Sequence, residues 1–287
     1  MKKKKLKTES LNDFHMLMCN DTPFAVKEAF GLLRTNILYT PYNGEGAPVY
    51  GVASVGESSG KSTIIANLAY SFANTQKKVL LIDADMRCPV QQEFFGYKKG
   101  TRGLSEILSG IVGDAHEVIF KSSSEYLDVI PSGHLPPNPA ELVLSPRLGE
   151  LITQMKKEYD YIFIDFPPVG VVADAVSAVN YVDGYMFVLR ANVTDKIGVM
   201  ECLDNLKNIG GNIIGIVFND VNYKDGMFAG KYKSRYGRYG KYGRYSRYSR
   251  YSRYNMYNRY ADSANNAPQN TQNTQNNTAV NSIETKE

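Results

Sequence analysis

Short apolar runs alternate with amphipathic stretches along most of the chain. Six runs have the length of strands: Val49–Val55, Val79–Asp83, Leu127–Pro131, Tyr161–Asp165, Gly184–Leu189 and Ile213–Phe218. Several of them are rich in Val, Ile and Leu without alternation, as expected of parallel strands covered by helices on both faces. The pattern predicts helices at Ala25–Ile37, Ser62–Asn74, Leu104–Leu108, Ala140–Lys157 (disturbed by Pro146), Ala173–Asn180 and Lys196–Ile209. This alternation predicts one α/β domain with a doubly wound, mostly parallel sheet.

The two ends of the chain do not follow this pattern. Residues 1–22 form a polar leader, and the predicted domain covers residues 23–222, with residues 23–45 as an N-terminal helical segment. Residues 223–260 form a Tyr/Arg-rich tail, and residues 261–287 are rich in Asn, Gln and Thr, so we expect this last segment to be disordered. Nine tyrosines at a spacing of three, called here the tyrosine ladder, are Tyr236, Tyr239, Tyr242, Tyr245, Tyr248, Tyr251, Tyr254, Tyr257 and Tyr260. A period of three fits neither a helix nor a strand, which predicts an exposed, flexible arm.

Charge is divided unevenly along the chain. The first seven residues carry five lysines, and residues 231–260 carry ten Lys or Arg and no acidic residue. The rest has 18 basic against 29 acidic residues, a net charge of −11 within a chain whose total is +4. Basic ends on an acidic body suit phosphate-rich partners, acidic surfaces or the inner membrane leaflet. Aromatic and basic residues together also suit single-stranded nucleic acid, but charge alone gives only nonspecific affinity, so we regard nucleic acid as an unlikely partner.

Cysteine usage and hydropathy indicate a cytosolic protein. Cys19, Cys88 and Cys202 lack metal or redox spacing, which fits a reducing compartment. No apolar run approaches the ~20 residues that a membrane span needs. The lysine-rich start is not followed by the apolar segment of a secretory signal. We therefore expect a cytosolic chain, and these features leave docking on a membrane partner open.

A glycine- and serine-rich segment follows the first predicted strand and opens a helix. It consists of Gly56, Glu57, Ser58, Ser59, Gly60, Lys61, Ser62 and Thr63. In a P-loop the backbone N–H groups and the helix N-terminus bind nucleotide phosphates. Lys61 is then expected to reach the β- and γ-phosphates of ATP, and the Ser62 hydroxyl to bind Mg²⁺. The match is imperfect, because the first glycine, Gly56, lies one place later than usual; the alternative is a chance Gly/Ser turn.

Carboxylates end two further predicted strands. Asp83 ends the second predicted strand and Asp85 follows it, and Asp165 ends the run Tyr161–Asp165, one residue before two prolines. The carboxyl edge of a parallel sheet is where such sheets bind ligands. An apolar strand ending in Asp is the Walker B arrangement, in which the carboxylate orients Mg²⁺. A solvated pair of turn aspartates is the alternative for Asp83 and Asp85.

These three motifs together resemble those of the bacterial tyrosine kinases, or BY-kinases, of capsule and exopolysaccharide systems. They are the P-loop, the Asp83–Arg87 segment (called Walker A′ in that family) and the Asp-x-Pro-Pro strand end at Asp165. The resemblance covers residues 23–221 and includes the stretches Arg34–Ile37, Gly103–Ser105, Pro136–Pro139 with Glu141 and Leu142, and Asp174–Ala175. It implies a P-loop NTPase of the deviant Walker type that uses ATP and Mg²⁺ to phosphorylate tyrosine, with the tyrosine ladder as the autophosphorylated cluster.

The resemblance also implies residue roles and partners. Lys61, Asp83, Asp85 and Asp165 are the catalytic candidates, with Asp83 accepting the tyrosine proton and Ser62, Asp85 and Asp165 in the metal shell; Arg87 helps to hold the A′ segment or the acceptor. Short relatives are half of a split system, so a transmembrane adaptor is expected to dock on the kinase at the inner face of the membrane and activate it. A tyrosine phosphatase and further copies of the chain, joined through the N-terminal helix, are the other expected partners.

Three positions depart from the family pattern. Ser58 stands where the family usually has glycine, and its Cβ is expected to crowd the β-phosphate. The N-terminal helix keeps Glu28 and Arg34 of the family's Glu-x-x-Arg-x-x-Arg pattern but has Gly31 in the middle, and Cys88 replaces a common basic residue. Two alternatives stay open: a partition- or division-type switch ATPase, whose signature lysine falls here on Gly56, and a catalytically impaired partner that binds ATP and is itself a substrate.

Overall fold

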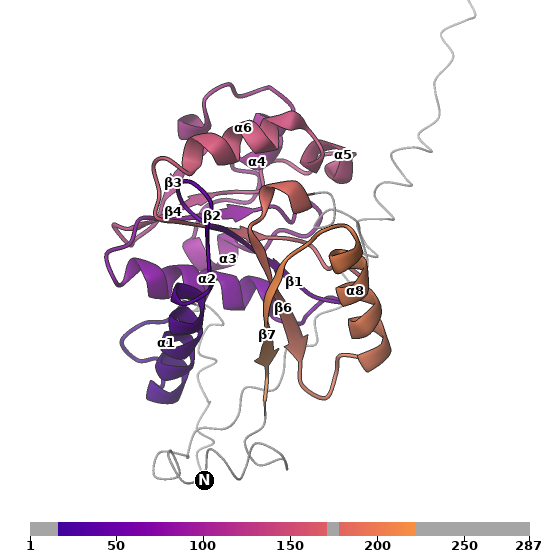
Figure 1. Ribbon diagram of the computed structural model, residues 1–287. Coiled ribbons are helices and arrows are strands. Elements are labelled where there is room, and N and C mark those ends of the chain that lie inside the picture. The colour runs from indigo at the N-terminus through magenta and orange to yellow at the C-terminus, as the bar shows by residue number, and fades with distance from the viewer. Residues whose placement is uncertain (1–16, 171–177, 222–287) are drawn as a thin grey trace, which may run out of the picture. The chain divides into compact units, whose positions relative to one another are not determined.

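The computed structural model describes residues 17–170 and 178–221. Seven strands form one sheet within these residues. They are β1 (Val49–Ala53), β2 (Val79–Asp83), β3 (Phe120–Lys121), β4 (Leu127–Ile130), β5 (Tyr161–Asp165), β6 (Gly184–Arg190) and β7 (Ile213–Asn219). The strand order is β3-β4-β2-β5-β1-β6-β7, and every pairing is parallel except that of β3 with β4. The prediction of a mostly parallel sheet is confirmed (Figure 1).

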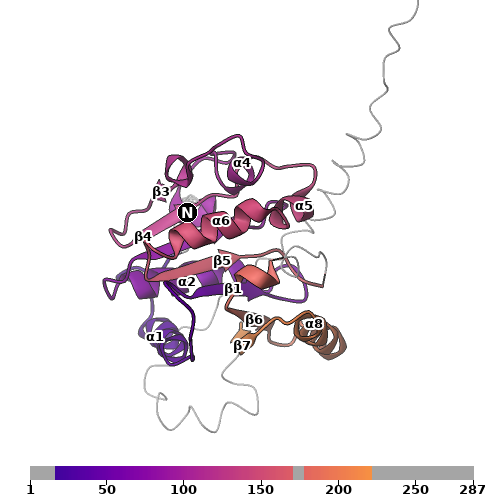
Figure 2. The same ribbon diagram turned by 45° about the horizontal axis from the view of Figure 1, so that its top comes forward.

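Helices cover both faces of this sheet. The α-helices are α1 (Phe24–Leu38), α2 (Lys61–Ala73), α3 (Gln92–Phe95), α4 (Leu104–Leu108), α5 (Pro139–Val143), α6 (Pro146–Met155) and α8 (Lys196–Asn208), with 3₁₀ turns η1 (Ala115–Val118) and η2 (Val179–Tyr181). In Figure 2, α4, α5 and α6 stand on one side of the sheet and α1 on the other. The doubly wound arrangement expected from the sequence is therefore present.

The central strands β1, β2 and β5 are almost entirely apolar because each face of the sheet packs into a different core. On β2, Leu80 and Ile82 join the cluster under α4, α6 and α8, whereas Val79 and Leu81 join the cluster under α1 and α2. Alternate residues of a strand point to opposite faces, so a strand buried on both sides reads as a continuous apolar run. All five residues of β2 are buried.

Several predicted elements differ from the observed ones. The expected helix Ala140–Lys157 is two helices, because Ser145 before Pro146 takes an extended conformation, with ψ of 138°, and its hydroxyl accepts from the Arg147 N–H. The residue before a proline avoids the helical region, so α5 ends there and Pro146 opens α6. The two-residue β3 and the single turn α3 carry too short a pattern to be predicted. The expected helix Ala173–Asn180 falls largely on residues 171–177, outside the described residues.

The strand order brings the three motifs to one edge of the sheet. The P-loop follows β1, the A′ segment follows β2 and the Walker B aspartate ends β5, and β5 lies between β2 and β1. In the register, Asp165 pairs with Asp83 on one side and with Val52 on the other. Motifs more than 100 residues apart in sequence are thus neighbours at the carboxyl ends of adjacent strands.

Candidate active site

The P-loop has a left-handed backbone at two of its residues. Ser58 has a φ of 57°, and Gly60, directly before α2, has a φ of 88°. The Ser54 and Ser59 hydroxyls both donate to the Gly56 carbonyl, at 2.9 and 2.8 Å, and tie the loop to itself. The loop leads into α2, whose first turn presents free N–H groups and the positive end of the helix dipole. This geometry suits the binding of phosphate groups.

Residues at the ends of β6 and β7 hold the same loop from the other side. The Asn219 amide donates to the Ser59 carbonyl at 2.9 Å, and the Arg190 guanidinium donates to the Ser58 carbonyl at 3.3 Å. Arg190 also pairs with Asp220 at 3.1 Å. A Cβ added at Gly60 would lie 2.0 Å from the Asn219 amide nitrogen, so this position requires glycine. These anchors fix the loop against the sheet.

Lys61 and Ser62 begin α2 on the side of the carboxylates. Lys61 is only 6% exposed, which is rare for a lysine and is tolerated only where opposite charge is near. The Lys61 ammonium and the Ser62 hydroxyl both act on Asp165 and tend to lower the pKa of that carboxyl. The structure therefore joins the P-loop helix to the Walker B strand through the residues that the sequence singled out.

Asp83 lies fully buried beside two other carboxylates. Burial, with the charges of Asp165 and Asp85, raises the pKa of Asp83 well above its usual range. Its Oδ1 accepts from the Asp85 N–H at 3.2 Å. Asp85, 4% exposed, accepts through Oδ1 from the backbone N–H groups of Cys88 and Arg87 at 2.9 and 3.3 Å, and so shapes the loop that follows β2.

Asp165 is also fully buried, and burial raises its pKa despite the opposing effects of Lys61 and Ser62. Its Oδ2 accepts from the Gln91 side chain at 2.7 Å. Two buried carboxylates paired in the register of adjacent strands repel each other, and their electrostatic cost falls when a cation or a proton is close. The arrangement suits a site that receives positive charge.

Four buried side-chain atoms in the described part of the chain have no hydrogen-bond partner: Asp83 Oδ2, Asp165 Oδ1, Gln91 Oε1 and Tyr97 Oη. The negative charges of Asp83 and Asp165 both raise the pKa of the Tyr97 phenol, although burial is the larger cause. Buried polar atoms are normally paired, so a group of orphans at one site indicates a place for a ligand or ion. All four are oxygens, and three of them, from two carboxylates and one amide, are of the kind that the shell of Mg²⁺ contains.

These residues do not form a metal site made of protein ligands alone. Within residues 17–170 and 178–221 there is no cluster of three or more His, Cys, Asp or Glu arranged to hold a metal ion. Mg²⁺ beside a nucleotide takes one or two protein oxygens and completes its shell with phosphates and water. Ser62 acts on the Asp165 carboxyl, and Asp165 Oδ1 has no hydrogen-bond partner, so these two residues fit that role.

Sequence reasoning missed four residues of this site. Arg190 and Asn219 could have been found as polar residues at the carboxyl ends of predicted strands. Gln91 and Tyr97 lie in the segment after the A′ motif, where nothing in the pattern of residues distinguishes them. The tyrosine ladder and Asp174–Ala175 lie outside the described residues.

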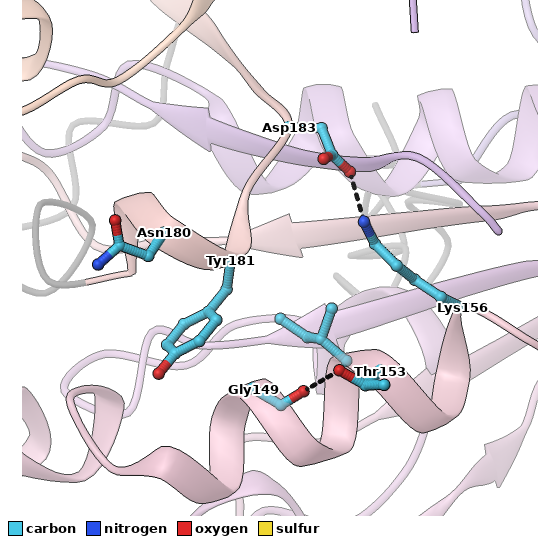
Figure 3. Close-up of a pocket in the computed structure, with 7 residues that line it drawn as sticks. Gly149, Thr153, Lys156, Asn180, Tyr181 and Asp183 are labelled. Atoms are coloured by element: carbon cyan, nitrogen blue, oxygen red, sulfur yellow. Dashed lines mark hydrogen bonds and ion pairs between the residues drawn. The ribbon is translucent and has the colours of Figure 1, made fainter. Parts of the chain in front are cut away.

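A separate hollow of about 220 Å³ lies away from this site (Figure 3). Its lining includes Lys156 and Asp183, which form an ion pair at 3.0 Å, and the Tyr181 ring. Asp183 Oδ2 accepts from the Val49 N–H at the beginning of β1, so the hollow belongs to the amino edge of the sheet. The P-loop and the carboxylates lie at the opposite, carboxyl edge, so this hollow is separate from the candidate phosphate site.

None of the helices in residues 17–170 and 178–221 has the length and apolarity to cross a bilayer.

Comparisons with known proteins agree with the geometry. The family described as an AAA domain matches residues 53–213, more than half of the chain. A curated relative, the tyrosine-protein kinase CpsD of Streptococcus agalactiae serotype III, is 36% identical over 196 residues, which cover 68% of this chain and 83% of the relative. The kinase domain of the Escherichia coli tyrosine kinase ETK superposes with a TM-score of 0.66 at 30% identity, covering 70% of this chain and 77% of that one.

The fold extends beyond kinases. The septum site-determining protein MinD of Pyrococcus horikoshii, in complex with Mg-ADP, has a TM-score of 0.52 at 24% identity, covering 60% of this chain and 70% of that one. At that identity the likeness shows a shared fold alone. The relatives that are more similar in sequence are kinases, and the chain accordingly belongs to the bacterial tyrosine-protein kinase family.

Proposed function

We propose that this chain transfers the γ-phosphate of ATP to tyrosine hydroxyls, including those of its own tyrosine ladder, and thereby regulates capsule or exopolysaccharide synthesis and export. The observation that carries the proposal is the convergence of buried Lys61, of Ser62 beside Asp165 and of the unpartnered Oδ2 of Asp83 at one edge of the sheet. A phosphate donor site and a proton acceptor are thereby side by side.

The P-loop side of the site binds the donor. Backbone N–H groups of residues 56–63 and the amino end of α2 hold the phosphates, and Lys61 neutralises charge on the β- and γ-phosphates. Ser62 and Asp165 hold Mg²⁺, with Asp85 supporting its shell. When bound, Mg²⁺ supplies positive charge that neutralises the phosphate oxygens and lowers the repulsion among the carboxylates.

Asp83 acts on the acceptor. A phenol with a pKa of about 10 is a weak nucleophile at neutral pH, so a carboxylate whose pKa is raised by burial is better matched to take its proton. The tyrosine oxygen forms a bond to the γ-phosphorus, the bond from that phosphorus to the bridging oxygen of ADP breaks, and the phenol proton passes to Asp83. Most of the rate enhancement comes from alignment and charge neutralisation around a loose transition state.

The proposed substrate is the tyrosine ladder of another copy of this chain. Residues 231–260 carry ten basic residues and no acidic ones, a charge opposite to that of the acidic body. Each phosphotyrosine adds about −1.5 to −2 charges, so phosphorylation of most of the ladder reverses the sign of the segment. A ladder bound in a neighbour's acidic active site is then released, which makes phosphorylation a switch of assembly.

Copies of the chain are proposed to assemble through α1, although only part of the family's residue pattern in this helix is available for contacts between copies. The Arg34 guanidinium donates through Nη1 to the carbonyl and hydroxyl of Ser71 at 2.7 and 2.8 Å, so it already links α1 to α2 within one chain. Glu28 is exposed and Gly31 has no side chain to offer a second copy. Contacts between copies therefore depend on Glu28 and on the exposed apolar residues of α1, such as Leu32.

A transmembrane adaptor of the polysaccharide co-polymerase type and a tyrosine phosphatase are the other proposed partners. The adaptor's cytoplasmic end docks on this chain, activates it and keeps it at the inner face of the membrane, while the phosphatase resets the ladder. This proposal is supported by the resemblance of the chain to the kinase half of split systems and by the relatives named above.

The test is transfer of label from [γ-³²P]ATP to tyrosine in the purified full-length chain, with and without a fused adaptor segment. The proposal predicts label that disappears in Lys61→Met and that falls strongly when all nine ladder tyrosines are changed to Phe. Absence of tyrosine label with every adaptor tried, together with intact ATP hydrolysis or ATP-dependent dimerisation, would establish the switch-ATPase alternative instead.

A further inference from the structure

Gln91 touches all three motifs of the site. Its backbone N–H acts on Asp83 of the A′ segment and tends to lower the pKa of that carboxyl, against the larger effect of burial. Its side-chain Nε2 donates to Asp165 Oδ2 at 2.7 Å and to the Ser62 carbonyl at 3.3 Å. The residue is fully buried, directly before α3. One residue outside the recognised motifs therefore connects β2, β5 and the first turn of α2.

The orientation of the Gln91 amide follows from its neighbours. The atom facing Asp165 Oδ2 and the Ser62 carbonyl has two acceptors around it, so it must be the NH₂ group, because an oxygen there would face two other oxygens. The remaining atom, Oε1, is buried and has no hydrogen-bond partner within the residues described. The unpartnered atoms of this pair are thus Gln91 Oε1 and Asp165 Oδ1.

We propose that Gln91 is a positioning residue for the metal side of phosphoryl transfer. By donating to Oδ2 it fixes the Asp165 carboxylate, and Asp165 Oδ1 and Gln91 Oε1 are left as the acceptors for the hydration shell of Mg²⁺. The inference rests on the proposed use of Asp165 at Mg²⁺. It assigns to the segment after the A′ motif a part in the site that the motifs themselves do not contain.

A side-chain substitution separates this role from the backbone role. The N–H to Asp83 comes from the main chain and persists with any residue other than proline. Methionine has nearly the length of glutamine and suits a buried position, but its thioether cannot donate a hydrogen bond. Gln91→Met therefore removes the contacts with Asp165 and Ser62 while keeping the contact with Asp83. Gln92, whose amide donates to the Pro89 carbonyl at 3.0 Å, provides the matched control Gln92→Met.

The test measures binding of a fluorescent ADP analogue to the full-length chain in Mg²⁺ and in EDTA. Nucleotide affinity in EDTA is expected to stay within about twofold in Gln91→Met. The gain in affinity that Mg²⁺ provides is expected to fall about tenfold, as for loss of a hydrogen bond to a charged group. Gln92→Met keeps the full gain. Thermal unfolding of each variant without nucleotide identifies a change that acts through the fold.

An unchanged Mg²⁺ gain in Gln91→Met, or an equal loss of affinity with and without Mg²⁺, would overturn the inference. If Gln91→Met does not fold, Gln91→Leu is measured in its place, because leucine also cannot donate a hydrogen bond to Asp165 or Ser62. The outcome is distinct from that of the labelling experiment. If Mg²⁺ increases nucleotide affinity in a Gln91-dependent way but tyrosine is never labelled, only the proposed kinase function is refuted. If tyrosine is labelled but Gln91→Met leaves the Mg²⁺-dependent gain in affinity unchanged, only the role of Gln91 is refuted.

Discussion

Ser58 occupies a left-handed backbone conformation in the loop that receives the phosphates, and its replacement by glycine has a calculable effect. A non-glycine residue with a φ of 57° is strained by about 1–2 kcal/mol relative to glycine. Glycine also gains freedom in the unfolded chain, which offsets part of that strain. The net expectation for Ser58→Gly is a free energy of unfolding higher by about 0.5–1 kcal/mol.

A second left-handed residue supplies the control. Gln76, with a φ of 61°, lies exposed in the turn after α2, away from the carboxyl edge of the sheet. Gln76→Gly is therefore expected to stabilise the fold by the same about 0.5–1 kcal/mol without any effect on nucleotide. Both variants keep the backbone contacts, which at Ser58 include the bond from Arg190 to its carbonyl.

Nucleotide affinity separates strain from crowding. If the loop is preformed, the strain at Ser58 is present with and without nucleotide, so its relief appears in stability and not in affinity. A tighter dissociation constant for Mg-ADP in Ser58→Gly alone, by about fivefold for each 1 kcal/mol, then measures crowding of the β-phosphate by the Ser58 Cβ.

Denaturant unfolding of the full-length chain and nucleotide titration provide the two measurements. If Gln76→Gly stabilises the chain and Ser58→Gly does not, the left-handed loop assigned to Ser58 is wrong. If neither variant changes Mg-ADP affinity, the sequence-based expectation that the Ser58 side chain obstructs the phosphate is wrong.

Three further expectations concern stability. Gly31 lies inside α1 with nothing within 4 Å of an added Cβ, so Gly31→Ala should raise the free energy of unfolding by about 1 kcal/mol, and a loss of stability in denaturant would contradict that. Tyr97→Phe removes a buried hydroxyl without a partner and should stabilise the chain by about 1 kcal/mol; destabilisation would show that the hydroxyl is paired in solution. Hydrogen bonds to Glu158 and Asp114 raise the pKa of His116 in the folded chain. Its contribution to the free energy of unfolding is therefore complete below the unfolded-state pKa of about 6.5 and is lost as pH rises through the pKa of the folded state. The stability difference between the parent chain and His116→Gln should shrink from pH 6 to pH 8.5 in urea titrations, and a difference that stays constant would refute the assignment.

The strands and the three motifs could be read from the sequence because their signals are local. β2 and β5 have the predicted bounds, since each is an apolar run that ends at an aspartate where the chain leaves the sheet. The convergence of Lys61, Asp83 and Asp165 followed from strands of one parallel sheet ending at one edge. Pro146 indicated a disturbance within the predicted helix Ala140–Lys157 but not that two helices are present, because a proline can either disturb a helix or begin a new one.

Other features depend on contacts that no local pattern carries. β3 is two residues long and owes its conformation to pairing with β4. The left-handed backbone at Ser58 goes against the preference of serine and is accompanied by anchors from β6 and β7, which come more than 130 residues later. Gln91 is one of two adjacent glutamines, and the fold alone buries it between β5 and α2 while Gln92 remains partly exposed.

The central claim, that Asp83 serves the acceptor tyrosine and not the nucleotide, is tested most directly by Asp83→Asn in the full-length chain. Two quantities are measured on the same preparation: the dissociation constant for Mg-ATP and the rate of phosphotyrosine formation. The account predicts Mg-ATP affinity within a few-fold of the parent chain and a phosphotyrosine rate lower by a factor of about 10²–10⁴, the usual contribution of a general base. An undiminished rate in Asp83→Asn, with Mg-ATP still bound, would contradict the account.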